Sequence, residues 1–161
     1  MSKIAIFSDV HGNDHALEAV IKDIKKESIT DCIFLGDLLA KGPNPKKTFQ
    51  LFNSLKPLVW IRGNTDAWYE DITKDWLPSN HREEILLDYY KYLLDEMDKD
   101  DIESLLSLPK QKSLVHEDIK ILCVHGSPKS ENDAMGEDVE IGKLEEMVDE
   151  KGKQEVLSNT R

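Results

Sequence analysis

Hydrophobic and polar positions along the chain follow two different periods, one typical of buried strands and one typical of amphipathic helices. Four short apolar runs predict strands at residues 4–7, 32–35, 58–61 and 119–124. Helical spacing of apolar residues predicts helices at residues 14–27, 46–55, 80–98, 102–106 and 142–150. The repeated change of period indicates an α/β protein.

The spacing of the strand ends indicates how the first three strands are connected. From Asp9 to Asp37 is 28 residues and from Asp37 to Asn64 is 27, close to the length of one βαβ unit. Parallel strands joined in this way place their carboxyl ends at one edge of the sheet. Residues that are far apart in sequence are therefore expected to meet at that edge.

Each predicted strand ends next to side chains that bind metal ions. Asp9 and His11 follow the first run, Asp37 the second, Asn64 the third and His125 the fourth. Asp9 and His11 are two residues apart on an extended chain, so their side chains leave the same face and can hold one ion. The carboxylate of Asp37 is expected to bridge this ion and a second one, which Asn64 and His125 complete.

A site that holds two metal ions in this way indicates an enzyme that hydrolyses phosphoesters. A water molecule that bridges two metals becomes hydroxide at neutral pH and attacks a phosphorus whose oxygens the metals neutralise. The nucleophile is then this hydroxide, and no side chain is predicted to form a covalent intermediate. Mixed nitrogen and oxygen ligands suit Mn, Fe, Zn, Ni or Co, and Mn is the first expectation.

Length and composition restrict the class of protein. The 161 residues predict a single domain, 1–161, in which a helical insertion at about residues 67–108 forms a cap beside the site. Hydrophobic residues make up 39% and charged residues 33%, the apolar runs are too short to span a membrane, and no secretory signal is recognised, so a cytoplasmic location is expected. A net charge of −11 argues against non-specific binding to nucleic acid.

Two local patterns complete the predicted fold. Residues 114–116 and 119–124 are expected to pair as a hairpin that leads into His125. Cys32 and Cys123 lie inside apolar runs, where a thiol is expected to be a small buried hydrophobe rather than half of a disulfide or a metal ligand.

The residues at the strand ends form four ordered motifs. They are Asp-Val-His-Gly-Asn at residues 9–13, Gly-Asp at 36–37, Gly-Asn-Thr-Asp at 63–66 and His-Gly at 125–126. In this order they resemble the calcineurin-like metallophosphoesterase family, and within it the small bacterial and archaeal phosphodiesterases, over nearly the whole chain. The resemblance implies a four-layer αββα sandwich with a dinuclear metal site at one edge.

The resemblance also implies roles for individual residues. Asp9 and His11 match ligands of the first metal, Asp37 matches the bridging carboxylate, and Asn64 and His125 match ligands of the second metal. Two divalent ions are the implied cofactors. The implied substrate is a small phosphorylated molecule, such as a nucleotide diester or a dinucleoside polyphosphate, hydrolysed as a phosphodiester.

The chain departs from the family pattern at two places. Thr65 stands where many members have a histidine that acts as an acid, so phosphate monoesters with poor leaving groups are disfavoured as substrates. No histidine follows His125, whereas the family closes its site with Gly-His-x-His. Three alternatives follow: a C-terminal part is missing, the chain is an inactive truncated copy, or the fold serves as a non-catalytic protein-binding module. An exposed sheet edge would favour self-association.

Several other residues are candidates with weaker support. Arg62 precedes the third motif and Asp66 is its last residue; both are interpreted as auxiliaries of the site, with a surface arginine and a helix N-cap as the alternatives. The remaining histidines are expected to lie at the surface; they are His15, His81 and His116. The tyrosines at positions 89, 90 and 92 are interpreted as helix core and boundary rather than as a platform for base stacking.

Overall fold

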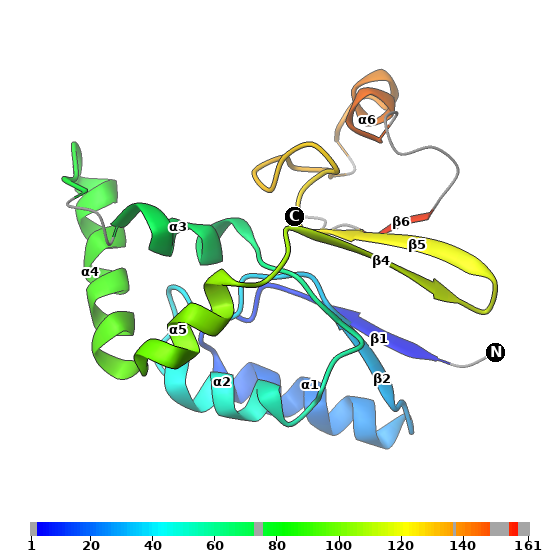
Figure 1. The fold of residues 1–161 in the computed structure, drawn as a ribbon, viewed down its shortest axis with the longest axis horizontal. Coiled ribbons are helices and arrows are strands. Elements are labelled where there is room, and N and C mark those ends of the chain that lie inside the picture. The colour runs from blue at the N-terminus through cyan, green and yellow to red at the C-terminus, as the bar shows by residue number, and fades with distance from the viewer. Residues whose placement is uncertain (1–2, 73–75, 137, 149–154, 158–161) are drawn as a thin grey trace.

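The first sheet places the predicted strand ends side by side. The computed structural model describes residues 3–72, 76–136, 138–148 and 155–157 (Figure 1). Strands β1 (Ile4–Phe7), β2 (Asp31–Phe34) and β3 (Val59–Trp60) form a parallel sheet in the order β1-β2-β3. The last three residues of β2 are buried, as expected for a central parallel strand with both faces covered.

The fourth apolar run lies in a second sheet that faces the first (Figure 1). Strand β4 (Gln111–His116) pairs antiparallel with β5 (Ile119–Val124), and β5 pairs parallel with β6 (Glu155–Leu157). The predicted hairpin is confirmed and begins earlier, at Gln111. Apolar side chains of both sheets pack together, among them Ile33, Ile61 and Cys123. The α/β class and the predicted sandwich are confirmed.

Two helices cover the outer face of the first sheet (Figure 1). Helix α1 (Asp14–Lys26) begins at Asn13, whose side chain accepts a hydrogen bond from the Ala16 amide. Helix α2 (Pro45–Asn53) starts with a proline, which suits the first turn because that turn needs no amide donor. Phe52 of α2 packs on Phe34 of β2 with ring centroids 4.5 Å apart, so the predicted apolar stripes form the core.

Three helices lie between β3 and β4, in the part of the chain where an insertion is predicted. They are α3 (Asn64–Ile72), α4 (His81–Glu96) and α5 (Lys99–Leu106), and their buried side chains join the same apolar cluster as α1 and α2. Helix α3 was not predicted, because its residues show no clear apolar stripe. Residues 73–75 of the insertion lie outside the described residues.

The last helix, α6 (Ile141–Val148), lies on the far side of the second sheet (Figure 1). Its predicted end at residue 150 falls outside the part of the chain that the structure describes. Within the described ranges, no helix combines the length and the apolar character that crossing a membrane requires.

Both cysteines are buried thiols in the interior of the sandwich. Cys32 belongs to β2 and Cys123 to β5, and both are free. Burial raises the pKa of both thiols, that of Cys123 to about 11. Both side chains therefore behave as the small buried hydrophobes that their positions in apolar runs predicted.

Candidate metal centre

The backbone beyond the first two strands brings Asp9 and Asp37 together. The parallel pairing of β1 and β2 continues into the following loops, since the Asp9 amide donates to the Gly36 carbonyl at 3.0 Å and the His11 amide to the Asp37 carbonyl at 3.0 Å. The two motifs are therefore held in register by main-chain hydrogen bonds. This is the edge at which the sequence places its first three candidate ligands.

The same loops adopt a backbone conformation that is unusual for residues with side chains. Asp9, His11 and Asp37 have φ values of 55°, 50° and 62°, in the left-handed region. Such conformations cost of order 1–3 kcal/mol each and concentrate at functional sites. Gly63 is required beside them because a Cβ there would lie 2.0 Å from Asp37 Oδ1. The loops thus direct the three side chains toward one point, and the backbone adopts a strained conformation to do so.

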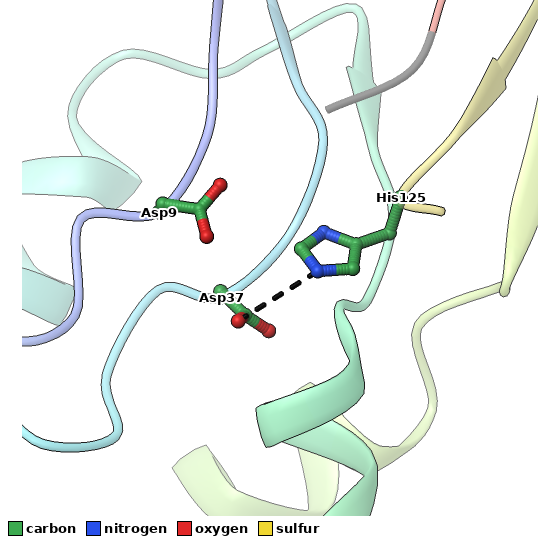
Figure 2. A group of neighbouring side chains, drawn as sticks. All are labelled: Asp9, Asp37 and His125. Atoms are coloured by element: carbon green, nitrogen blue, oxygen red, sulfur yellow. Dashed lines mark ion pairs between the residues drawn. The ribbon is translucent and has the colours of Figure 1, made fainter. Parts of the chain in front are cut away.

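Four of the five predicted ligand side chains surround one small volume. Metal-ligating atoms of Asp9, Asp37 and His125 lie within 4.8 Å of one another (Figure 2). Asp37 Oδ2 is 3.7 Å from Nε2 of His11 and 3.7 Å from Nε2 of His125. His11 Nε2 is also 3.5 Å from Asp9 Oδ1. The carboxylate of Asp37 therefore lies between the two imidazoles, as expected for a bridging group.

The fifth predicted side chain, Asn64, joins the group from the start of α3. Its Oδ1 lies 2.9 Å from His125 Nε2. His125 reaches this position from the second sheet, because it follows β5, whereas Asn64 follows β3 of the first sheet. The structure therefore brings together all five side chains predicted from the strand exits, and it does so across the interface between two sheets.

Hydrogen bonds to backbone carbonyls determine which ring nitrogen of each histidine carries a hydrogen. Nδ1 of His11 lies 3.0 Å from the Ala40 carbonyl oxygen, and Nδ1 of His125 lies 2.7 Å from the Leu35 carbonyl oxygen. A carbonyl oxygen can only accept, so Nδ1 must be the donor in both rings. In the neutral tautomer, Nε2 then presents a lone pair to the group of oxygens, which is the form that binds a metal.

The site consequently gathers acceptors that need a positive partner. Two carboxylates, an amide oxygen and two Nε2 lone pairs face one another, and among the described residues no hydrogen-bond donor reaches Asp9 Oδ2. Burial acts to raise the pKa of Asp9, but contacts with His11, Ser8 and His125 outweigh it and hold this pKa below its ordinary value. A divalent cation would also be attracted to these acceptors, so the donor set fits a metal.

Asp66, the first of the two predicted auxiliary residues, is buried next to the backbone of the site. Its Oδ2 accepts hydrogen bonds from the amides of Asp37 at 2.9 Å and of Gly63 at 2.8 Å. Burial and the charge of Asp37 raise its pKa to about 6, against the opposing effect of these amides. Asp66 therefore ties the second and third motifs together through their backbones.

Arg62, the other predicted auxiliary, is buried next to the third motif. Its Nη1 is 3.0 Å from Glu70 Oε1 and its Nε is 3.2 Å from Glu131 Oε1. These ion pairs join α3 to the loop after His125. Contact of Arg62 with a phosphate stays a prediction.

Several residues that support the site carry no recognisable sequence signal. The carbonyls of Leu35 and Ala40 orient the histidines, and any residue type could supply them. The Tyr90 hydroxyl donates to the Thr65 carbonyl and anchors the first turn of α3. The Thr65 amide donates to Asp37 Oδ1 at 3.0 Å. His15 and His81 are exposed, as predicted for surface histidines, and His116 is partly buried.

Comparison with known proteins connects this geometry to a family. A family model described as calcineurin-like phosphoesterase matches residues 2–159. An uncharacterised protein of Methanocaldococcus jannaschii is 42% identical over 65 residues, which make up 40% of this chain and 26% of that protein.

Two solved structures resemble the fold. A hypothetical protein of Pyrococcus horikoshii OT3 has a TM-score of 0.74 at 23% identity, over 91% of this chain and 64% of that one. A metallophosphoesterase from Sphaerobacter thermophilus has a TM-score of 0.58 at 29% identity, over 80% of this chain and 49% of that one. The chain therefore spans less than two thirds of each of these relatives.

Proposed function

The chain belongs to the calcineurin-like phosphoesterase family, and on this premise we propose that it hydrolyses phosphodiesters with the help of two divalent metal ions. The observation that carries the proposal is the cluster of acceptors at the two facing sheets. Carboxylate oxygens, imidazole nitrogens and an amide oxygen converge there from five side chains.

The proposed ligand sets divide the cluster between two ions. Asp9, His11 and Asp37 hold the first, and Asp37, Asn64 and His125 hold the second, with Mn as the first candidate. When bound, the ions supply hydroxide at neutral pH and neutralise the phosphate oxygens. The carbonyls behind the two imidazoles favour the tautomer in which Nε2 carries no hydrogen and is available to a metal.

The residue after Asn64 bears on the substrate class. Thr65 has no proton to donate at a useful pKa, which disfavours phosphate monoesters with poor leaving groups. The substrate class that we propose is therefore a nucleotide diester or a dinucleoside polyphosphate. We further propose that residues 1–161 act as one domain in which α3, α4 and α5 form a cap beside the site.

The proposal is tested by hydrolysis of bis-p-nitrophenyl phosphate with added Mn²⁺. We expect turnover that is abolished by a chelator and by Asp37→Asn. Asp23→Asn is the matched control, because it makes the same chemical change at an exposed position of α1. Asp23→Asn should keep the full activity.

The same experiment separates the alternative function. A purified chain that binds no Mn²⁺ and hydrolyses no ester at any metal concentration would contradict the proposal. That result would favour the non-catalytic module, in which the fold is kept for contact with another protein.

A further inference from the structure

Helix α4 has two apolar faces, of which only one contributes to the core. Tyr90 and Leu93 are buried against α3 and the first sheet's helices. Ile85, Tyr89 and Tyr92 form a second stripe, and their exposed fractions are 43%, 41% and 41%. The spacing of four and three residues places these side chains on one face of the helix. A grouped exposed stripe of this kind marks a binding surface more often than isolated apolar residues do.

The exposed stripe forms one wall of a groove. The other wall is the loop Lys41–Pro43, and the groove has a volume of about 460 Å³ with a mainly apolar lining. The Tyr92 hydroxyl donates to the Pro43 carbonyl at 2.6 Å, which fixes the ring relative to the loop. Ligand pockets for small molecules have volumes of about 300–1,000 Å³, so the groove has the size of a subsite for a planar group.

The loop wall of the groove touches the backbone of His11, one of the proposed metal ligands. A Cβ at Gly42 would lie 1.8 Å from the His11 carbonyl oxygen, so the two backbones touch. Ala40, the residue immediately before the loop Lys41–Pro43, provides the carbonyl that holds His11 Nδ1. Lys41 has a φ of 82°, which is uncommon for a residue with a side chain. One short loop therefore orients His11 on one side and lines the groove on the other.

From this contact we propose that the groove binds a nucleobase of the phosphodiester whose phosphate lies at the metal centre. The inference rests on the proposed function. Tyr89 and Tyr92 offer aromatic faces, on which any base can stack. Asp88, the acidic side chain at the groove, is 80% exposed and so adds little base discrimination. The subsite therefore selects nucleoside esters as a class and tolerates different bases.

The structure places Tyr90 on a different face of α4 from Tyr89 and Tyr92, a distinction that the sequence did not reveal. They were interpreted together as helix core and boundary, and this holds for Tyr90, which is 2% exposed. Tyr89 and Tyr92 lie on the other face of α4 and line the groove. Stacking is therefore assigned to these two side chains alone.

The test compares two diesters that release the same leaving group. The p-nitrophenyl ester of thymidine 5′-monophosphate carries a base, and ethyl p-nitrophenyl phosphate does not. We expect the ratio of their kcat/KM values, measured with Mn²⁺, to fall about tenfold in Tyr89→Ala, the lower part of the range for one stacked base. Tyr89→Phe keeps the ring and should keep the ratio. Leu94→Ala, an exposed apolar residue elsewhere on α4, should also keep it.

A binding measurement separates failure of this inference from failure of the proposed function. Saturation-transfer NMR with AMP in the presence of chelator should saturate the base protons more strongly than the ribose protons, and Tyr89→Ala should remove this difference. Turnover of both esters with a ratio unchanged by Tyr89→Ala would overturn the subsite and leave the hydrolase intact. If neither ester is hydrolysed, the hydrolase proposal fails and the AMP spectra alone decide the subsite.

Discussion

Replacing Asp37 with asparagine should make the metal-free protein more stable, although it should destroy metal binding. In the absence of metal, the carboxylates of Asp37 and Asp9 face each other and two imidazole lone pairs. Asparagine has nearly the same shape, and its Oδ1 can still accept the hydrogen bond from the Thr65 amide. The substitution therefore removes one charge without removing the contact that positions the side chain.

The size of the effect follows from the geometry. Two unit charges 4.8 Å apart, the limit for these ligating atoms, repel by about 3.5 kcal/mol at an effective dielectric constant of about 20. The Asp9 side chain is 27% exposed, so solvent screening reduces the net gain to about 1–2 kcal/mol. For a chain of this length, such a gain raises Tm by about 2–8 °C.

The assay is thermal unfolding at pH 8, where free imidazole is neutral. In chelator, Asp37→Asn should melt above the parent protein, and Asp23→Asn should not differ from it. With Mn²⁺ at about 100 times Kd, the parent should gain about 2.7 kcal/mol, and Asp37→Asn should gain much less. If Asp37→Asn melts below the parent in chelator, the carboxylates do not repel one another and the reasoning is refuted.

Two further predictions concern the surroundings of the site. Gly42→Ala should lower the affinity for Mn²⁺ about tenfold or more, because its Cβ would displace the His11 carbonyl 1.8 Å away. Gly142→Ala is the control, because nothing lies within 4 Å of the added atom, and it should leave a Mn²⁺ titration unchanged. Equal affinities for both variants would contradict the prediction. A hydrogen bond from Lys47 lowers the pKa of Asp14 to about 2, below an unfolded value near 3.9, so ionised Asp14 stabilises the fold above about pH 4 and this stabilisation disappears as the pH falls toward 2. The Tm difference between the parent and Asp14→Asn should therefore be largest at neutral pH and should vanish near pH 2; a difference that is constant with pH would contradict this.

The convergence of the five candidate side chains could be predicted from the sequence because they lie next to strand ends. A strand fixes where its last side chain lies, and parallel pairing carries Asp9 and Asp37 to one edge without further information. The helices between the strands were found because their apolar faces pack on that sheet, as Phe52 does. Periodicity and strand order were sufficient at these positions.

Other parts depend on contacts that the local pattern does not encode. Helix α3 follows Asn64 and is held by the Tyr90 hydroxyl, a residue 25 positions away from its partner Thr65. The tautomers of His11 and His125 are determined by backbone carbonyls, which any residue provides. The face of α4 that lines the groove is defined by its contact with the loop Lys41–Pro43, which the pattern of apolar residues in α4 does not encode.

The number of metal ions bound per chain tests the central claim most directly. After equilibrium dialysis against Mn²⁺ and removal of free metal, elemental analysis by mass spectrometry gives this number for the parent and for Asp37→Asn. The two ligand sets predict about two ions per parent chain and a marked loss in Asp37→Asn, with Asp23→Asn equal to the parent. A folded parent chain that retains no Mn²⁺ would contradict the account.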